Sequence, residues 1–288
     1  IALRSTLSSD AIAGLYIGYN GVNNNAGHVS PLMRYNSNSG RKEFGATAAI
    51  NDGNWHHVAM VIDQDNDLFI TYIDGTPYNI AQTINGALDF QDHISIGAEL
   101  EWITANDSGA NTDKRFLEGT IDDVRIYQRA LTASEISTLY SIAPGCSEIT
   151  TDNLVAQWKL DETTGTTATD SVGSNDGTYN GFDATSTVAG IDGTAQNFDG
   201  TDDYIEIPDS ADFTFTGDFA LSAWIKHSGA AEANVDDGWR IISQQESGNH
   251  FVFRINDSSG GTNGTVHFSI YNGSHNYVNS TTNVKDGQ

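Results

Sequence analysis

Short runs of β-branched and aromatic residues, separated by polar turns, constrain the fold of this chain most strongly. Residues Trp55–Ile62 read WHHVAMVI, and residues Leu68–Ile73 read LFITYI. The acidic segment Asp63–Asp67 separates the two runs, which predicts a β-hairpin. Similar runs recur at residues 204–207, 251–255 and 266–271. We therefore expect an all-β protein made of many short strands.

One stretch is typical of a helix instead of a strand. Thr132 has the side chain of an N-cap, and Glu135 follows three residues later, which is the spacing of a capping box. An apolar stripe at helical spacing consists of Leu131, Ile136, Leu139 and Tyr140. The sequence therefore predicts one short helix over residues 131–140.

The charge of the chain excludes several classes of function. Its 288 residues include 13 Lys and Arg against 38 Asp and Glu, which gives a formal net charge of −25. Such a field repels phosphate backbones and anionic lipids, so we expect no nucleic-acid partner. The longest clean apolar run, Val58–Ile62, is far too short to span a bilayer, so we expect no membrane insertion.

A polar segment without periodicity follows the predicted helix. It extends from Pro144 to Asn153 and contains a Pro-Gly pair, which indicates a linker. Cys146 in this segment is the only cysteine, so an intramolecular disulfide is impossible. Two interpretations of Cys146 stay open, a free thiol and a disulfide with another chain. Because the chain starts with Ile-Ala-Leu, we expect it to be a piece of something longer.

Short matches within the chain indicate an internal repeat. They pair Tyr19-Asn20 with Ile255-Asn256 and Tyr35-Asn36 with Tyr271-Asn272, both offset by 236 residues, and Asp52-Gly53 with Asp286-Gly287, offset by 234. We therefore divide the chain into the back part of a first repeat at residues 1–145, a linker at 146–153, and the front part of a second repeat at 154–288.

Longer motifs in both parts resemble a known family. After the linker they are Leu154–Glu162, Asn197–Gly200, Asp203–Pro208 and Phe219–Ile225, and before it Asp52–Ala59, Ile94–Gly97 and Gly119–Tyr127. In this spacing the chain resembles the laminin-G-like, concanavalin A-like jelly rolls of secreted bacterial proteins and pentraxins. The resemblance implies an antiparallel sandwich of two sheets, a fold that hosts lectins, adhesion modules and glycosidases alike.

The resemblance also implies which strands meet. In this family the first strand of a domain pairs near the last, and here the two halves occur in reversed order. We therefore expect residues 154–160 to pair with residues 124–127, within one chain or between neighbouring chains. Each half alone would leave open sheet edges and uncovered apolar faces, so some completion is required.

Calcium is the cofactor that the resemblance implies. Ca²⁺ takes six to eight oxygen ligands, and the family places a turn-rich loop beside an Asp of the last strand. Carried over, this makes Asp170 and Asn175 ligands from the loop, together with Asp122 or Asp123 from the strand. Ordinary turn formation by these Asx residues is the alternative.

The sequence carries no recognisable catalytic motif of this fold. Related glucanases place their acids as Glu-x-Asp-x-x-Glu on one strand, and no Glu-x-Asp occurs here. Glu99 and Glu101 alternate, but Trp102 follows and no third acid completes the motif. Consecutive rings of His56 and His57 point to opposite faces of a strand, which favours a structural role. We therefore expect that the chain is not an enzyme.

Glycan recognition needs exposed aromatic side chains, and two tryptophans lie in polar stretches. These are Trp102 and Trp239, whereas Trp55, Trp158 and Trp224 lie in strand patterns and are expected in the core. The leading hypothesis is a secreted or cell-surface module for carbohydrate recognition or adhesion, with a glycan or an extracellular protein as its partner. A filament or stalk subunit assembled as a homo-oligomer by half-domain exchange, and an accessory module of a larger hydrolase, are the alternatives.

Overall fold

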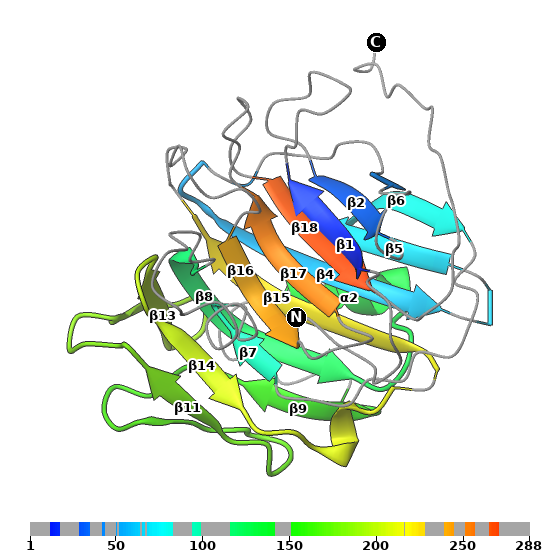
Figure 1. The fold of residues 1–288 in the computed structure, drawn as a ribbon. Helices are drawn as coiled ribbons and strands as arrows, with labels where there is room; N and C mark the ends of the chain where they lie inside the picture. Colours follow the sequence, from blue (N-terminus) through cyan, green and yellow to red (C-terminus); the bar gives the residue numbers. More distant parts are fainter. Residues whose placement is uncertain are drawn as a thin grey trace.

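The structure is a computed structural model that describes the greater part of the chain. The described residues are 12–17, 29–34, 42–43, 50, 52–63, 65–66, 68–82, 94–98, 116–141, 151–215, 217–227, 239–244, 251–256 and 265–270. Glu99, Glu101, Trp102 and Cys146 lie outside them, so the expectations for these residues stay predictions. Within the described part the strands form two large sheets, and Figure 1 shows strands of one sheet in front of those of the other.

The first sheet has eight strands. Its order is β12 (Thr187–Ala189), β13 (Thr194–Asp199), β8 (Glu118–Tyr127), β15 (Phe219–Lys226), β4 (Trp55–Asp63), β5 (Leu68–Ile73) and β6 (Thr76–Gln82), and β9 (Leu154–Trp158) also pairs with β8. All of these pairs are antiparallel. Strands β4 and β5 form the predicted hairpin around residues 63–67.

The second sheet has ten strands. Its order is β10 (Thr167–Ala168), β11 (Gly177–Asn180), β14 (Tyr204–Ile207), β7 (Ile94–Ile96), β16 (Trp239–Gln244), β17 (Phe251–Asn256), β18 (Thr265–Ile270), β1 (Ile12–Ile17), β2 (Val29–Arg34) and β3 (Lys42–Glu43). Neighbours in this order are antiparallel, and β1 makes one further parallel contact with β17. Strands β2 and β18 begin at residues 29 and 265, which is the offset of the sequence repeat.

The main core lies between the two sheets. In the strands whose side chains are described, it is built largely by alternate residues, because successive side chains of a strand point to opposite faces. Val58, Met60 and Ile62 of β4 belong to it, together with Ile205 and Ile207 of β14 in the other sheet. The predicted all-β sandwich of two antiparallel sheets is thereby confirmed.

A helix covers part of the outer face of the eight-stranded sheet. Helix α2 (Ala133–Ser141) buries Ile136 and Leu139 in a second apolar cluster that includes Ala59 and Val61 of β4. Strand β4 is therefore buried on both faces over much of its length. The predicted helix is confirmed, and no helix in the described part of the chain has the length and apolar character that a membrane crossing needs.

Strands from before and after the linker alternate in the eight-stranded sheet. Strand β8 lies between β13 and β15, and β15 lies between β8 and β4. The expected pairing of β8 with β9 is present within one chain, with Val124 opposite Trp158 and Tyr127 opposite Leu154. The division of the chain into parts of two repeats stays a prediction.

Candidate functional site

A row of polar and aromatic residues crosses the outer face of the eight-stranded sheet beyond the helix. Asn197 of β13 lies opposite Thr120 of β8, Thr120 lies opposite Lys226 of β15, and Lys226 lies opposite Trp55 of β4. Residues directly opposite each other on neighbouring strands point to the same face of a sheet. The four side chains therefore form one line across four strands, three strand spacings or about 14 Å long.

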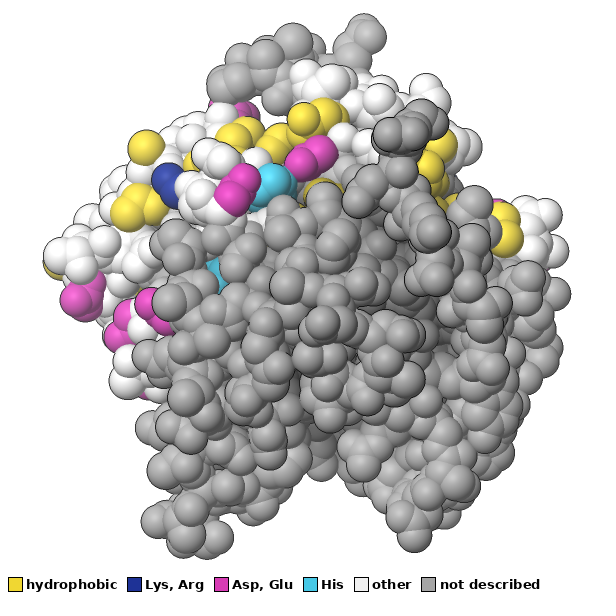
Figure 2. All heavy atoms as spheres, turned by 90° about the horizontal axis from the view of Figure 1, so that it is seen from above, with side chains coloured by type: hydrophobic (Ala, Val, Ile, Leu, Met, Phe, Trp, Pro, Cys, Tyr) yellow, Lys and Arg dark blue, Asp and Glu magenta, His cyan; other side chains and the backbone are white. Residues whose placement is uncertain are grey.

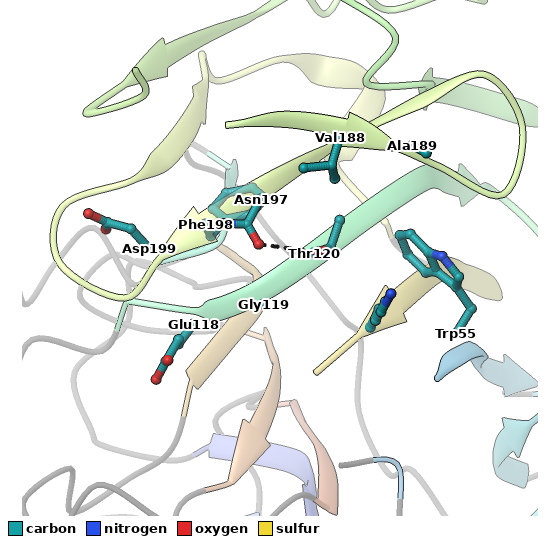
Figure 3. Close-up of a pocket in the computed structure, with 10 residues that line it drawn as sticks. Trp55, Glu118, Gly119, Thr120, Val188, Ala189, Asn197, Phe198 and Asp199 are labelled. Carbon is teal, nitrogen blue, oxygen red and sulfur yellow. Dashed lines mark hydrogen bonds between the residues drawn. The ribbon is translucent and has the colours of Figure 1, made fainter. Parts of the chain in front are cut away.

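This row forms the floor of an open groove of about 540 Å³. Val188 and Ala189 of the edge strand β12 line the same groove, and so do Glu118 and Asp199. Figure 3 shows Trp55 toward one end of the hollow and Glu118 and Asp199 toward the other. The Thr120 hydroxyl donates a hydrogen bond of 3.3 Å to Asn197 Oδ1, which links two strands in the middle of the row.

The helix determines where the groove ends. In the next row of the same face, Asp122 lies opposite Trp224, and Trp224 lies opposite His57. Tyr140 near the end of α2 stacks on Trp224, with ring centroids 5.8 Å apart. Trp224 is therefore only 8% exposed, whereas Trp55 in the uncovered row is half-buried.

The three tryptophans expected in the core have different environments. Trp158 is fully buried, and its Nε1 donates a hydrogen bond of 2.9 Å to the carbonyl of Asn175. Trp224 is buried by Tyr140. The expectation for Trp55 is wrong, because α2 stops before the first residues of β4 and leaves this indole in the groove.

Two tryptophans were predicted to bind a ligand, and neither side chain is described. Trp239 is the first residue of β16, with Ile255 of β17 opposite, and only its backbone is described. Trp102 lies outside the described residues altogether. The groove residues that sequence reasoning missed are Thr120, Asn197 and Lys226, which carry no local motif and meet only through strand pairing.

An acidic cluster adjoins the groove in the turn between β13 and β14. One carboxylate oxygen from each of Asp199, Asp202 and Asp203 lies within 4.8 Å of the other two. Burial, together with the negative charges of Asp199 and Asp202, raises the pKa of Asp203 to about 6. A cation would relieve this repulsion, so the cluster could hold a metal ion.

The carboxylate of Asp170, a predicted calcium ligand, is surrounded by N–H donors. Its Oδ1 accepts hydrogen bonds of 3.0 Å from the backbone N–H groups of Gln157 and Val172. Its Oδ2 accepts from the backbone and side-chain amides of Asn175, at 3.1 and 3.2 Å. These contacts occupy the lone pairs that a Ca²⁺ ion would need, so they fit a loop-holding Asx residue better than a metal ligand.

The two aspartates predicted from the last strand have separate environments. Asp122 Oδ2 accepts hydrogen bonds from the backbone N–H groups of Ile191 and Asp192, at 2.6 and 3.3 Å. Asp123 stands at a bulge of β8 with a φ of 48° and forms an ion pair of 2.8 Å with Arg125. Gln157 Nε2 donates a 2.7 Å bond to Asp123 Oδ1, which connects Asp123 but not Asp122 to the Asp170 loop. The described contacts thus give no oxygen cage shared by Asp122, Asp123, Asp170 and Asn175, and calcium at this position stays a prediction.

The two histidines at the start of β4 have structural contacts. His56 Nδ1 lies 2.8 Å from Asp74 Oδ2, and His56 Nε2 lies 3.1 Å from Asp52 Oδ1. The hydrogen bond to Asp74 raises the pKa of His56, whereas burial lowers the pKa of His57 to about 4. Figure 2 shows a histidine side chain between acidic side chains on one face of the molecule.

Comparison with known proteins agrees with the fold and the sequence motifs. The family described as the concanavalin A-like lectin/glucanases superfamily (Laminin_G_3) matches residues 3–137 and 199–288. The chain therefore belongs to this superfamily, whose sandwich of two sheets the described strands form. No curated protein and no solved structure matches the chain.

Proposed function

We propose that this domain is a non-catalytic carbohydrate-recognition module that works outside the cell. The single observation that carries the proposal is the open groove across β13, β8, β15 and β4. Its size falls within the roughly 300–1,000 Å³ that is usual for ligand-binding pockets. Membership of a superfamily that includes lectins supports the same conclusion, although the fold alone does not decide the function.

The residues of the groove suit the surface of a sugar. The indole of Trp55 offers a flat apolar face for the C–H side of a sugar ring, with an N–H donor at its edge. Asn197, Thr120 and Lys226 offer amide, hydroxyl and ammonium groups for sugar hydroxyls. Because the row is about 14 Å long, the groove fits a short oligosaccharide that runs across the strands better than a single ring.

The proposal of a non-catalytic role takes account of two acids in the groove. Glu118 and Asp199 lie opposite each other on β8 and β13, and glycosidases do use pairs of carboxyl groups. Both side chains are exposed to solvent, whereas a general acid generally needs a buried site that raises its pKa. We therefore expect no hydrolysis of bound glycans. Turnover that disappears in Glu118→Gln would contradict this expectation.

The binding proposal is tested by screening a glycan array and then titrating the oligosaccharides that bind. Trp55→Ala should weaken binding at least tenfold, because it removes the stacking face. Trp55→Phe, which keeps an aromatic ring, should retain most of the affinity. Val172→Ala is the surface control, since Val172 is 45% exposed and does not line the groove. Equal affinities of Trp55→Ala and the control would refute the assignment of the groove.

We also propose that Ca²⁺ stabilises the domain through Asp199, Asp202 and Asp203. The support is the short distance between their carboxylate oxygens, at which the negative charges of the three groups repel one another. A ligand that binds only the folded state adds about 2.7 kcal/mol at a hundredfold excess over Kd. The melting temperature should rise with Ca²⁺ and fall in chelator, and Asp202→Asn should reduce this response. A response that survives in Asp202→Asn and disappears in Asp170→Asn would place the ion in the Asp170 loop instead.

A further inference from the structure

The two halves of the chain are interleaved strand by strand. Residues up to 141 supply β4, β7 and β8, and residues from 151 onward supply β9 and β13 to β16. Strand β8 has three neighbours, β9, β13 and β15, and all three come from the other half. In the ten-stranded sheet β7 likewise lies between β14 and β16. The closed sandwich therefore requires strands of one half to insert between strands of the other.

The strand pairings that join the two halves, called the seams here, are long, and that of β15 with β4 is continuous in register. Strand β15 pairs with β4 from Phe219 opposite Ile62 to Lys226 opposite Trp55. It also pairs with β8 along its other edge. If the halves separate, β8 and β15 expose unpaired backbone on both edges, together with apolar side chains such as Ile126 and Leu221. Such edges bind any chain that offers the matching strand.

A second copy of this chain offers all of the matching strands. Every contact across the seams can form equally between two chains, because only residues 142–150 connect the half that ends at α2 with the half that includes β9. Within one chain β15 must find β4 across more than 150 residues of sequence, and contacts of such separation form slowly. At high protein concentration a neighbouring chain competes for the same pairing.

We propose that two copies of this chain exchange halves when they fold in concentrated solution. In the resulting dimer, β8 of each chain pairs with β9, β13 and β15 of the other. Each dimer contains two complete sandwiches, and each sandwich keeps the registers found within the single chain. The partner is specific, because it must supply the same cross-strand neighbours, including Asp199 opposite Glu118 and Trp158 opposite Val124.

The test uses chains of all 288 residues and a cysteine pair at one seam. Glu118 and Asp199 are exposed register partners on β8 and β13, and opposed Cβ atoms lie about 4.5–5.5 Å apart, which is close to the roughly 3.5–4.5 Å of a disulfide. Two single variants, Glu118→Cys and Asp199→Cys, are made in a Cys146→Ser background. They are mixed in denaturant, refolded together at low and high protein concentration, and oxidised. The double variant in one chain shows that the engineered disulfide forms in the folded protein.

The mixture should give disulfide-linked dimers whose fraction rises at least fivefold from the low to the high protein concentration. The matched control mixes Glu118→Cys with Thr178→Cys, because Thr178 is exposed on β11, which pairs with β10 and β14 among the described strands and not with β8. This control should give only background cross-linking. A fraction of disulfide-linked dimers no higher than that in the control mixture would refute the proposed exchange of halves. Unlinked dimers measured by light scattering, without the specific disulfide, would overturn it equally, because they would show association by another surface.

Discussion

Asp122 carries a buried carboxyl group that its surroundings satisfy only in part. The residue is fully buried, and two backbone N–H groups donate to its Oδ2. Among the described residues, its Oδ1 has no hydrogen-bond partner. Burial, together with the charges of Asp123 and Asp161, raises the pKa of Asp122 to about 7. Below about pH 7 the neutral acid is therefore favoured in the folded state, and a metal ion at Asp122 would have to displace its proton.

Asp122→Asn should stabilise the protein at pH 8 in the presence of a chelator. An amide oxygen can accept the two backbone bonds, and the variant no longer loses a proton inside the fold. The wild-type carboxyl contributes stability at low pH that is lost as pH rises toward and through about 7. We expect a gain on the order of 1–2 kcal/mol at pH 8 and little change at pH 5, measured by urea unfolding. A loss of stability at pH 8 together with a lost Ca²⁺ response would favour Asp122 as a metal ligand.

His56 connects two turns through its ring nitrogens, and its contribution depends on pH. The protonated ring donates to both Asp74 and Asp52, so the pKa of His56 lies above its ordinary value of 6.5. A group with a raised folded pKa stabilises fully below the unfolded pKa, and this stability is lost as pH rises through the folded pKa. His56→Gln should therefore cost about 1 kcal/mol more at pH 6 than at pH 9. Denaturant unfolding at the two pH values measures this, and an equal cost at both would contradict the protonated bridge.

Helix α2 depends on a capping box that the sequence already indicated. Glu135 Oε2 accepts a 2.8 Å bond from the backbone N–H of Thr132, and the Glu135 N–H donates to Thr132 Oγ1 at 3.3 Å. Thr132→Ala should reduce stability by about 1 kcal/mol, because it leaves a helix N–H group without its acceptor. Thr138→Ala is the control, since Thr138 is exposed and its hydroxyl bonds only within the helix. Similar melting temperatures for the two variants would show that the cap contributes nothing.

Features of single elements could be predicted from the sequence because their causes are local. The capping box of α2 and the β4–β5 hairpin depend on residues a few positions apart. The role of Trp55 could not be predicted in this way. A strand pattern shows that alternate residues share a face. The position of α2 on that face decides which of these side chains are covered and which remain in the groove. For this reason Trp224 is buried and Trp55 is only half-buried, although both lie in the same kind of strand pattern.

At the scale of the whole molecule, the groove could not be predicted from any local signal. Thr120 and Asn197 are 77 residues apart in sequence, and they meet because β8 lies next to β13. The motifs that resemble the family did predict that β8 and β9 would pair.

The function of the Asp170 loop was ambiguous in principle. A loop that contains Asp, Asn and Gly residues is as typical of an Asx turn as of a calcium-binding loop.

The interleaved strands predict that the sandwich unfolds as one cooperative unit. Ile126 of β8 and Phe198 of β13 belong to opposite halves, and both are buried in the core between the sheets. Ile126→Ala and Phe198→Ala should each cost on the order of 2–5 kcal/mol. Because the described neighbours of β8 all come from the other half, neither half keeps its core when the other unfolds. Each variant should therefore shift one common transition, with circular dichroism and tryptophan fluorescence coinciding. Two transitions, of which Ile126→Ala moves only one and Phe198→Ala only the other, would show that the halves fold independently.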